Sequence, residues 1–365
     1  MNQNRTSDKN RSYSQNDVQS GSESKTHIGK IDADKFTSFV SKRLGAENNS
    51  IVAPPSNGID AGVIDIGNGK VLVVAEDPIL AIPGQPLEMF GWYTVHIGAS
   101  DVAVMGVKPE FMTYTLLLPP ETPDSHLEII IDSIHKAALE LGIAIIGGHT
   151  GFYPGFSAPT IGGITVFGMT EKDKYITPAM AKPGNEIILT KGPAIETTGI
   201  LSVFREKELS EKMDVKILEK AKDFCKKITV VEDALTAFSS GKVTAMHDAT
   251  EGGVIGGLFE IANASNVGMI IDENLFFYPE EVRLVCKNLN IDPVEAISEG
   301  SLLIAAEKGS SASIIENLEK KGISATVIGH VTDNPDERVI NRENGDLQEL
   351  RVPAEDPFWK AFFAN

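Results

Sequence analysis

The hydrophobic and polar positions of this chain alternate as they do in mixed α/β domains. Apolar residues follow one stripe of 122–141, which predicts an amphipathic helix that begins at Thr122-Pro123 and ends at Gly142. Two β-branched runs, Gly62–Ile66 and Lys70–Ala75, flank an Asn-Gly turn and predict a β-hairpin. The first half of the chain also predicts helices at 34–44 and 86–105 and strands at 111–118, 143–146 (a buried strand) and 160–169.

The alternation resumes after a stretch punctuated by Pro178, Pro183 and Gly184, where we place a domain boundary. The second half predicts strands at 186–189, 243–246, 269–271, 301–306 and 326–331, and helices near 217–226, 232–238, 253–264, 279–289 and 310–321. We therefore expect an α/β protein with mixed sheets and two domains, 31–177 and 178–345. A polar segment, 1–30, is expected to be disordered or to serve as an interaction tail. The apolar spacing after Asp356 predicts a docking helix within the tail 346–365.

Composition narrows the class of protein. Apolar residues make up 42% of the 365 residues and charged residues 23%, as expected for a globular chain. Thirty-three basic and 51 acidic residues give a formal charge of −18, which disfavours binding to nucleic acid or to anionic membranes. Cys225 and Cys286 stand apart without metal-ligand spacing, and the chain has no apolar run long enough to span a membrane. We expect a cytoplasmic protein.

The motif His247-Asp248-Ala-Thr-Glu-Gly252-Gly253 carries the strongest chemical signal. It follows an apolar strand and opens a helix, so the amides of Gly252 and Gly253 are candidates to bind an anion such as a phosphate. A carboxylate such as Asp248 beside an anion is favourable when a divalent cation lies between them. The alternative is an ordinary helix start capped by Asp248 or Thr250.

Four further motifs place an acid or a histidine beside small residues at the end of an apolar element. They contain Asn57-Gly58-Ile-Asp60, Glu76-Asp77-Pro, Ser-Asp101-Val and Gly147-Gly148-His149-Thr150. Each alone is typical of a turn or a cap. Together, Asp60, Asp77 and Asp101 could converge as oxygen ligands of Mg²⁺ on a triphosphate. The sequences of a P-loop, a dinucleotide-binding loop and a nucleophile elbow are absent, which excludes those routes.

The order of these motifs resembles that of the aminoimidazole ribonucleotide (AIR) synthase-related superfamily. The similarity runs from about residue 54 to 331, and the segment D-A-T-E-G-G-V-I-G-G-L-F-E-I-A-N-A is most similar to the hydrogenase expression/formation (HypE) branch. The resemblance implies a homodimer in which the N-terminal domains join into a β-barrel, with ATP bound in a cleft. It also implies an ATP-dependent enzyme that phosphorylates an amide-like or other oxygen of an acceptor, either a small molecule or a group borne by a protein.

Carried over by motif, the resemblance assigns roles to individual residues. Asp60, Asp77 and Asp101 would hold Mg²⁺, and Asp101, His149 and Asp248 would take part in catalysis. The residues assigned to nucleotide binding are Asn57, Gly58, Asp60, Asp77, Gly147, Gly148, Thr150, Gly252 and Gly253.

Three departures from the HypE pattern leave the activity open. The chain lacks the C-terminal cysteine on which HypE acts, His149 stands where several relatives have an acid, and Glu251 stands where HypE has arginine. A nucleotide-binding regulatory or assembly protein without turnover is therefore the alternative interpretation.

Overall fold

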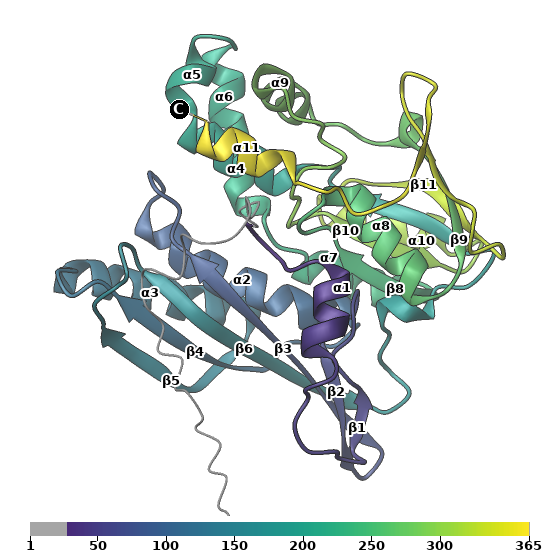
Figure 1. Ribbon diagram of the computed structural model, residues 1–365, viewed down its shortest axis with the longest axis horizontal. Helices are drawn as coiled ribbons and strands as arrows, with labels where there is room; N and C mark the ends of the chain where they lie inside the picture. The colour runs from purple at the N-terminus through teal and green to yellow at the C-terminus, as the bar shows by residue number, and fades with distance from the viewer. Residues whose placement is uncertain (1–27, 365) are drawn as a thin grey trace, which may run out of the picture.

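The computed structural model describes residues 28–364, so nearly all of the expected N-terminal tail lies outside the described residues. Two mixed sheets, each covered by helices, form the two halves of the molecule (Figure 1). The first sheet has the strand order β1-β2-β3-β6-β4-β5, and the second has the order β13-β12-β9-β11-β7-β10-β8. Most neighbours are antiparallel, but β4–β5 and β9–β12 are parallel, which confirms a mixed α/β fold.

The elements have the following bounds. The first sheet contains β1 Ile51–Ala53, β2 Gly62–Gly67, β3 Lys70–Leu80, β4 Phe111–Leu118, β5 Ala144–Phe152 and β6 Thr160–Glu171. The second contains β7 Glu186–Thr190, β8 Val243–Asp248, β9 Gly268–Asp272, β10 Leu302–Ala306, β11 Ala325–Thr332, β12 Arg338–Asn341 and β13 Leu347–Glu349. The helices are α1 Ala33–Lys35, η2 Phe36–Val40, α2 Leu87–Val104, α3 Asp124–Leu141, η3 Pro178–Met180, α4 Ile195–Phe204, α5 Glu206–Ser210, α6 Val215–Lys222, η4 Asp223–Lys227, α7 Val231–Ser240, α8 Gly253–Ala264, η5 Glu273–Leu275, α9 Glu280–Leu289, α10 Ser311–Lys320 and α11 Pro357–Phe363.

The expected strands and long helices are present, and two local expectations were wrong. The helix expected at 34–44 is one turn, α1, followed by a short π-helical segment, η2. The strand expected to be buried at 143–146 is the start of β5, an edge strand whose Ile145 and Ile146 are exposed. These errors arise because short apolar runs do not reveal which sheet face or edge they will occupy.

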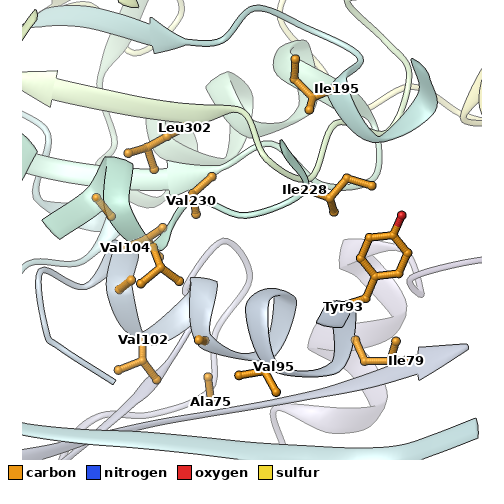
Figure 2. Packing of buried hydrophobic residues seen from close by; sticks show 14 of the residues in the cluster. Ala75, Ile79, Tyr93, Val95, Val102, Val104, Ile195, Ile228, Val230 and Leu302 are labelled. Atoms are coloured by element: carbon orange, nitrogen blue, oxygen red, sulfur yellow. The ribbon is translucent and has the colours of Figure 1, made fainter. Parts of the chain in front are cut away.

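Helix α2 joins the two halves. It lies against β3 and β6 of the first sheet and also against α7 and β8 of the second half, so it is buried nearly all around. Figure 2 shows Val95, Val102 and Val104 of α2 in one apolar cluster that continues to Val230 and Leu302 of the second half. This shared core holds the end of α2 in a fixed position relative to β8.

Within residues 28–364, one face of the first sheet carries no long helix, since α2 packs on the other face against β3 and β6. Val63, Val71 and Val73 are buried on the helix-covered side, whereas Ile64, Leu72 and Met169 form a row on the opposite side. Phe111 and Phe167 stack on the same open side, with their ring centroids 5.6 Å apart. The open face is therefore unusually apolar for a surface exposed to water.

The C-terminal helix α11 docks on α4 (Figure 1). Phe362 stacks on Phe204, and the Arg205 guanidinium donates hydrogen bonds to the carbonyl groups of Ala361 and Ala364. Asp356 caps α11 by accepting from the amide of Phe358, as the sequence pattern indicated. None of the helices in the described part of the chain is long and apolar enough to cross a membrane.

We predict that Gly148→Ala destabilises the protein far more than Gly147→Ala does. Gly148 has a φ of 142°, and a Cβ atom there would lie 2.2 Å from the carbonyl oxygen of Tyr114. A Cβ atom at Gly147 would have a Thr113 methyl group as its nearest atom, 3.6 Å away, so Gly147→Ala serves as the matched control. We expect a loss of ~2 kcal/mol or more for Gly148→Ala, measured by urea unfolding. Equal unfolding midpoints for the two variants would contradict the expectation.

Candidate functional site

The acids singled out in the sequence meet where the two halves of the molecule join. Asp77 points from β3 toward α2, and its carboxyl group lies against that of Asp101, near the C-terminal end of α2. Asp60 lies in the loop before β2, and Asp248 lies at the end of β8. The charges of Asp60, Asp77 and Asp248 all act on Asp101. Folding thus gathers four carboxyl groups that are as much as 188 residues apart in sequence.

His247 is held inside this cluster by two acids. Its Nδ1 lies 2.7 Å from Oδ1 of Asp60, and its Nε2 lies 2.7 Å from Oε2 of Glu260 on α8. Burial disfavours the charged ring, but the two carboxylates outweigh burial and raise the pKa of His247 well above its usual range. His247 therefore acts as a charged bridge between the loop before β2 and helix α8. The resemblance assigns a catalytic role to His149 and none to His247, although His247 stands beside Asp248 in the strongest of the motifs.

Burial and mutual repulsion make the acid cluster unfavourable by itself. Burial, followed by the charges of Asp77 and Asp248, raises the pKa of Asp101 well above its usual range. Burial also raises the pKa of Asp60, to about 6, even though His247 opposes the shift. The negative end of the α2 dipole adds to the cost of ionising Asp101. Such a site favours a bound cation.

The carboxylate oxygens of this cluster are suitable ligands for Mg²⁺. Both carboxylate oxygens of Asp248 and Oδ2 of Asp60 are buried without a hydrogen-bond partner among residues 28–364. One atom each from Asp60, His247 and Asp248 lies within 4.8 Å of the others. Unpaired carboxylate oxygens are the ligands that Mg²⁺ prefers. Asp60 and Asp248, with Asp77 and Asp101 beside them, are therefore the residues that could hold the ion.

A second acidic pair, which the sequence analysis missed, lies beside Asp248. Glu299 is 3% exposed, and one of its oxygens has no hydrogen-bond partner in the described part of the chain. Burial and the nearby charge of Asp248 raise its pKa well above the usual range. Burial also raises the pKa of Glu196, on α4, to about 8, and its carboxylate accepts from the amide of Glu299. Because the two residues are 103 positions apart, no local pattern could have paired them.

The backbone amides of Gly252 and Gly253, which the sequence predicts to bind a phosphate, are hydrogen-bonded to other groups of the protein. The amide of Gly252 donates to Asp356 at 2.8 Å, and the amide of Gly253 donates to the carbonyl of Thr250. Neither amide is therefore free in this structure, and Gly252 itself, in the left-handed conformation, forms the N-cap of α8. The alternative caps, Asp248 and Thr250, do not supply a side-chain cap either.

The Asn57-Gly58 loop lies at the edge of the acid cluster. Gly58 packs against Glu260, since a Cβ atom at Gly58 would lie 3.3 Å from both the Glu260 Cβ and its carbonyl oxygen. Glu260 in turn binds His247. The structure therefore brings this loop toward the site, with Asn57 exposed at its tip.

The Gly147-Gly148-His149-Thr150 motif is not brought to the acids of the same chain. It forms part of β5 rather than a loop, and His149 pairs with Thr115 of β4 on the open face of the sheet. Asp77 points to the opposite, helix-covered face, and β5 lies three strands from β3, roughly 14 Å away. The His149 ring instead contacts the hydroxyl of Tyr153 at 2.7 Å. An open pocket of about 360 Å³ adjoins this motif.

Comparison with known proteins identifies the class. The N-terminal domain of AIR synthase related proteins matches residues 58–178, and the C-terminal domain of the same proteins matches residues 182–341. The chain belongs to the AIR synthase related protein family. It is therefore a member of a family of enzymes, as the names of its relatives also indicate.

Several relatives share most of the chain. A putative hydrogenase expression/formation protein of Methanocaldococcus jannaschii is 28% identical over 75% of this chain and 79% of its own. The carbamoyl dehydratase HypE of Rhizobium leguminosarum bv. viciae is 27% identical over 75% of this chain and 77% of its own. A selenide, water dikinase of Myxococcus xanthus is 27% identical over 74% of this chain and 82% of its own.

Solved structures share the fold. The HypE–HypF complex includes a chain with a TM-score of 0.69 and 21% identity, covering 87% of this chain and 99% of that one. The structure of HypE in complex with ATP has a TM-score of 0.64 and 23% identity, and the match covers 82% of this chain and 89% of that one. At these identities the likeness establishes the two-domain architecture.

We predict that Glu196→Gln reduces the loss of stability that occurs as the pH rises. The raised pKa means that folded Glu196 keeps its proton up to about pH 8, whereas the unfolded side chain loses it near pH 4.5. This carboxyl group therefore makes folding progressively less favourable between those two values. The variant carries no such charge, so its melting temperature at pH 8 should exceed that of the wild type by about 2 °C or more. The exposed Glu121→Gln variant is the control, and parallel pH profiles for all three proteins would refute the expectation.

Proposed function

We propose that this chain is an ATP-dependent enzyme that uses Mg²⁺-ATP to phosphorylate an amide-like or other oxygen of an acceptor molecule. The observation that carries the proposal is the meeting of Asp60, Asp77, Asp101 and Asp248 from both halves of the molecule at one buried cluster. Buried carboxylates of like charge are costly unless cations neutralise them. A polyphosphate bridged by Mg²⁺ is the ligand that this charge pattern suits.

The chain's own residues then position the reactants. Bound Mg²⁺ would neutralise charge on the phosphates and on the developing transition state. Asp77 and Asp101 would orient the metal–nucleotide from the first half, and Asp248 would do so from the second. Because the shared core fixes α2 relative to β8, the carboxylates are held ready for the nucleotide before it binds.

Glu299 and Glu196 support an acceptor with amide character. Burial raises the pKa of Glu196 to about 8, so at neutral pH its carboxyl group is predominantly protonated and can donate as well as accept hydrogen bonds. Burial and the charge of Asp248 raise the pKa of Glu299 in the same direction. A neutral carboxyl group complements a carboxamide, which also presents one donor and one acceptor side by side. Glu299 lies directly beside Asp248, which places this pair at the border of the proposed phosphate site.

The acceptor is proposed to be a separate molecule. The segment 356–364 is anchored by the Phe204–Phe362 stack and by Asp356, whose carboxylate accepts from the amide of Gly252. Because residues 356–364 are held in this way, we propose that they do not carry the acceptor group into the site. Either a small molecule or a group borne by another protein remains compatible with the proposal.

We predict that Asp101→Asn weakens the binding of ATP in the presence of Mg²⁺ by about tenfold or more, about 1.4 kcal/mol. The same change removes one of the buried like charges, so the melting temperature in EDTA should stay level or rise. Isothermal titration calorimetry measures the first effect and circular dichroism measures the second. Asp173→Asn, an exposed residue in a surface turn, is the control. A wild-type protein that binds no ATP with Mg²⁺ present would overturn the proposed function.

We also propose a homodimer that forms through the open face of the first sheet. The row Ile64, Leu72 and Met169 and the stacked Phe111 and Phe167 give this face the apolar character of a subunit interface. Joining two such faces would bury them and form the barrel implied by the family resemblance.

Met169→Glu is expected to convert the dimer to a monomer, because it places a charge in the centre of this apolar face. Size-exclusion chromatography with light scattering gives the molar mass directly. Leu139→Glu is the control, since Leu139 is also an exposed apolar residue but lies on α3, on the other side of the sheet. A Met169→Glu protein with the mass of the wild-type dimer, or a monomeric wild type, would rule out this interface.

A further inference from the structure

The segment just before α1 reaches into the acid cluster. The ammonium of Lys30 donates a hydrogen bond to Oγ1 of Thr250 at 3.0 Å, two residues beyond Asp248. The Lys30 backbone amide donates to Oε2 of Glu251 at 2.6 Å. Gly29 is equally close, because a Cβ atom there would lie 2.4 Å from the same carboxylate oxygen. The segment is therefore attached to the Thr250-Glu251 turn at consecutive residues.

Lys30 faces the same carboxylates that suit a divalent cation. Although burial opposes it, the negative charges of Glu260, Asp101, Asp248 and Asp77 raise the pKa of Lys30. In return, Lys30 opposes the upward pKa shifts of Asp60, Asp77 and Asp101. Its ammonium thus provides positive charge to a cluster whose remaining oxygens lack partners.

We propose that Lys30 is an exchangeable counter-ion of this site: it neutralises the carboxylates in the metal-free protein and is displaced when a divalent cation binds. The inference rests on the proposed function, because it assumes that the acid cluster is the metal site. A divalent cation bound by these carboxylates and the ammonium beside them repel each other, since charges in a poorly solvated site are weakly screened. Binding of a divalent cation therefore releases the ammonium from the cluster.

Glu251 has a defined part in this exchange. At this position a carboxylate holds the backbone of Lys30, whereas an arginine side chain would repel the lysine and could not accept from its amide. The acidic residue beside the predicted anion site thus fits a role in positioning the Lys30 segment. Residues 28–30 lie at the surface although the Lys30 ammonium is buried against the acids, so release of the segment from the turn exposes little apolar surface.

The test measures the affinity for Mn²⁺, a probe of the divalent site, by electron paramagnetic resonance in the absence of nucleotide. Lys30→Met removes the competing charge and should tighten Mn²⁺ binding by about tenfold. Lys30→Arg keeps the charge and should remain near the wild-type affinity. Lys35→Met is the matched control, because Lys35 lies five residues away and pairs with Asp32.

Hydrogen exchange supplies a second measurement on the wild-type protein. The Lys30 amide is protected by Glu251, so addition of Mg²⁺ should accelerate its exchange if the segment is displaced. The inference is overturned if Lys30→Met binds Mn²⁺ no more tightly than the wild type and if Mg²⁺ leaves the exchange of the Lys30 amide unchanged. That outcome would not affect the proposed binding of Mg²⁺-ATP by the wild type. Absence of Mn²⁺ binding by both wild type and Lys30→Met would overturn the metal site itself, and with it the proposed function.

Discussion

Repulsion between buried carboxylates is the constraint around which this molecule is organised. Asp77 and Asp101 lie side by side, and Asp60 and Asp248 add their charges from two other elements. The fold does not relieve this repulsion by solvation. It supplies His247 and Lys30 as internal cations and leaves several carboxylate oxygens without partners. The remaining unfavourable charge is what makes the site suited to a metal-bridged polyphosphate.

The scaffold resists this repulsion through the apolar core that the two halves share. Helix α2 contributes Asp101 from near its end, and its valines pack against Val230 and Leu302 of the second half (Figure 2). Gly98 allows α2 to approach β6 closely, since a Cβ atom there would lie 2.7 Å from Ile164. Burial of apolar surface along α2 thus provides the free energy that keeps the carboxylates together.

The turn after β8 connects the ends of the described chain to the site. Thr250 and Glu251 bind the Lys30 segment, and Gly252 binds Asp356 of the C-terminal segment. The amides that could have bound an anion are therefore engaged by the protein, and a carboxylate occupies one of them. These contacts are those of a turn that positions two other segments of the chain, not of a helix start that simply binds phosphate. The local sequence is the same for both kinds of turn.

The sequence by itself determined the helices and strands and the acidic residues at their ends. Hydrophobic periodicity located the long helices and most strands, because the period of side-chain burial depends on local geometry. Acids at the ends of apolar elements identified Asp60, Asp77, Asp101 and Asp248, since a carboxylate there is costly without a partner.

Only the tertiary structure decided which of these residues share a site. His149 has as strong a motif as Asp77, but strand alternation and sheet order put it on the opposite face. Lys30, Glu260 and Glu299 have no local motif, and they reach the cluster through contacts between residues far apart in the chain. Sheet order, strand register and the packing of the two halves depend on such long-range contacts, which local patterns do not specify.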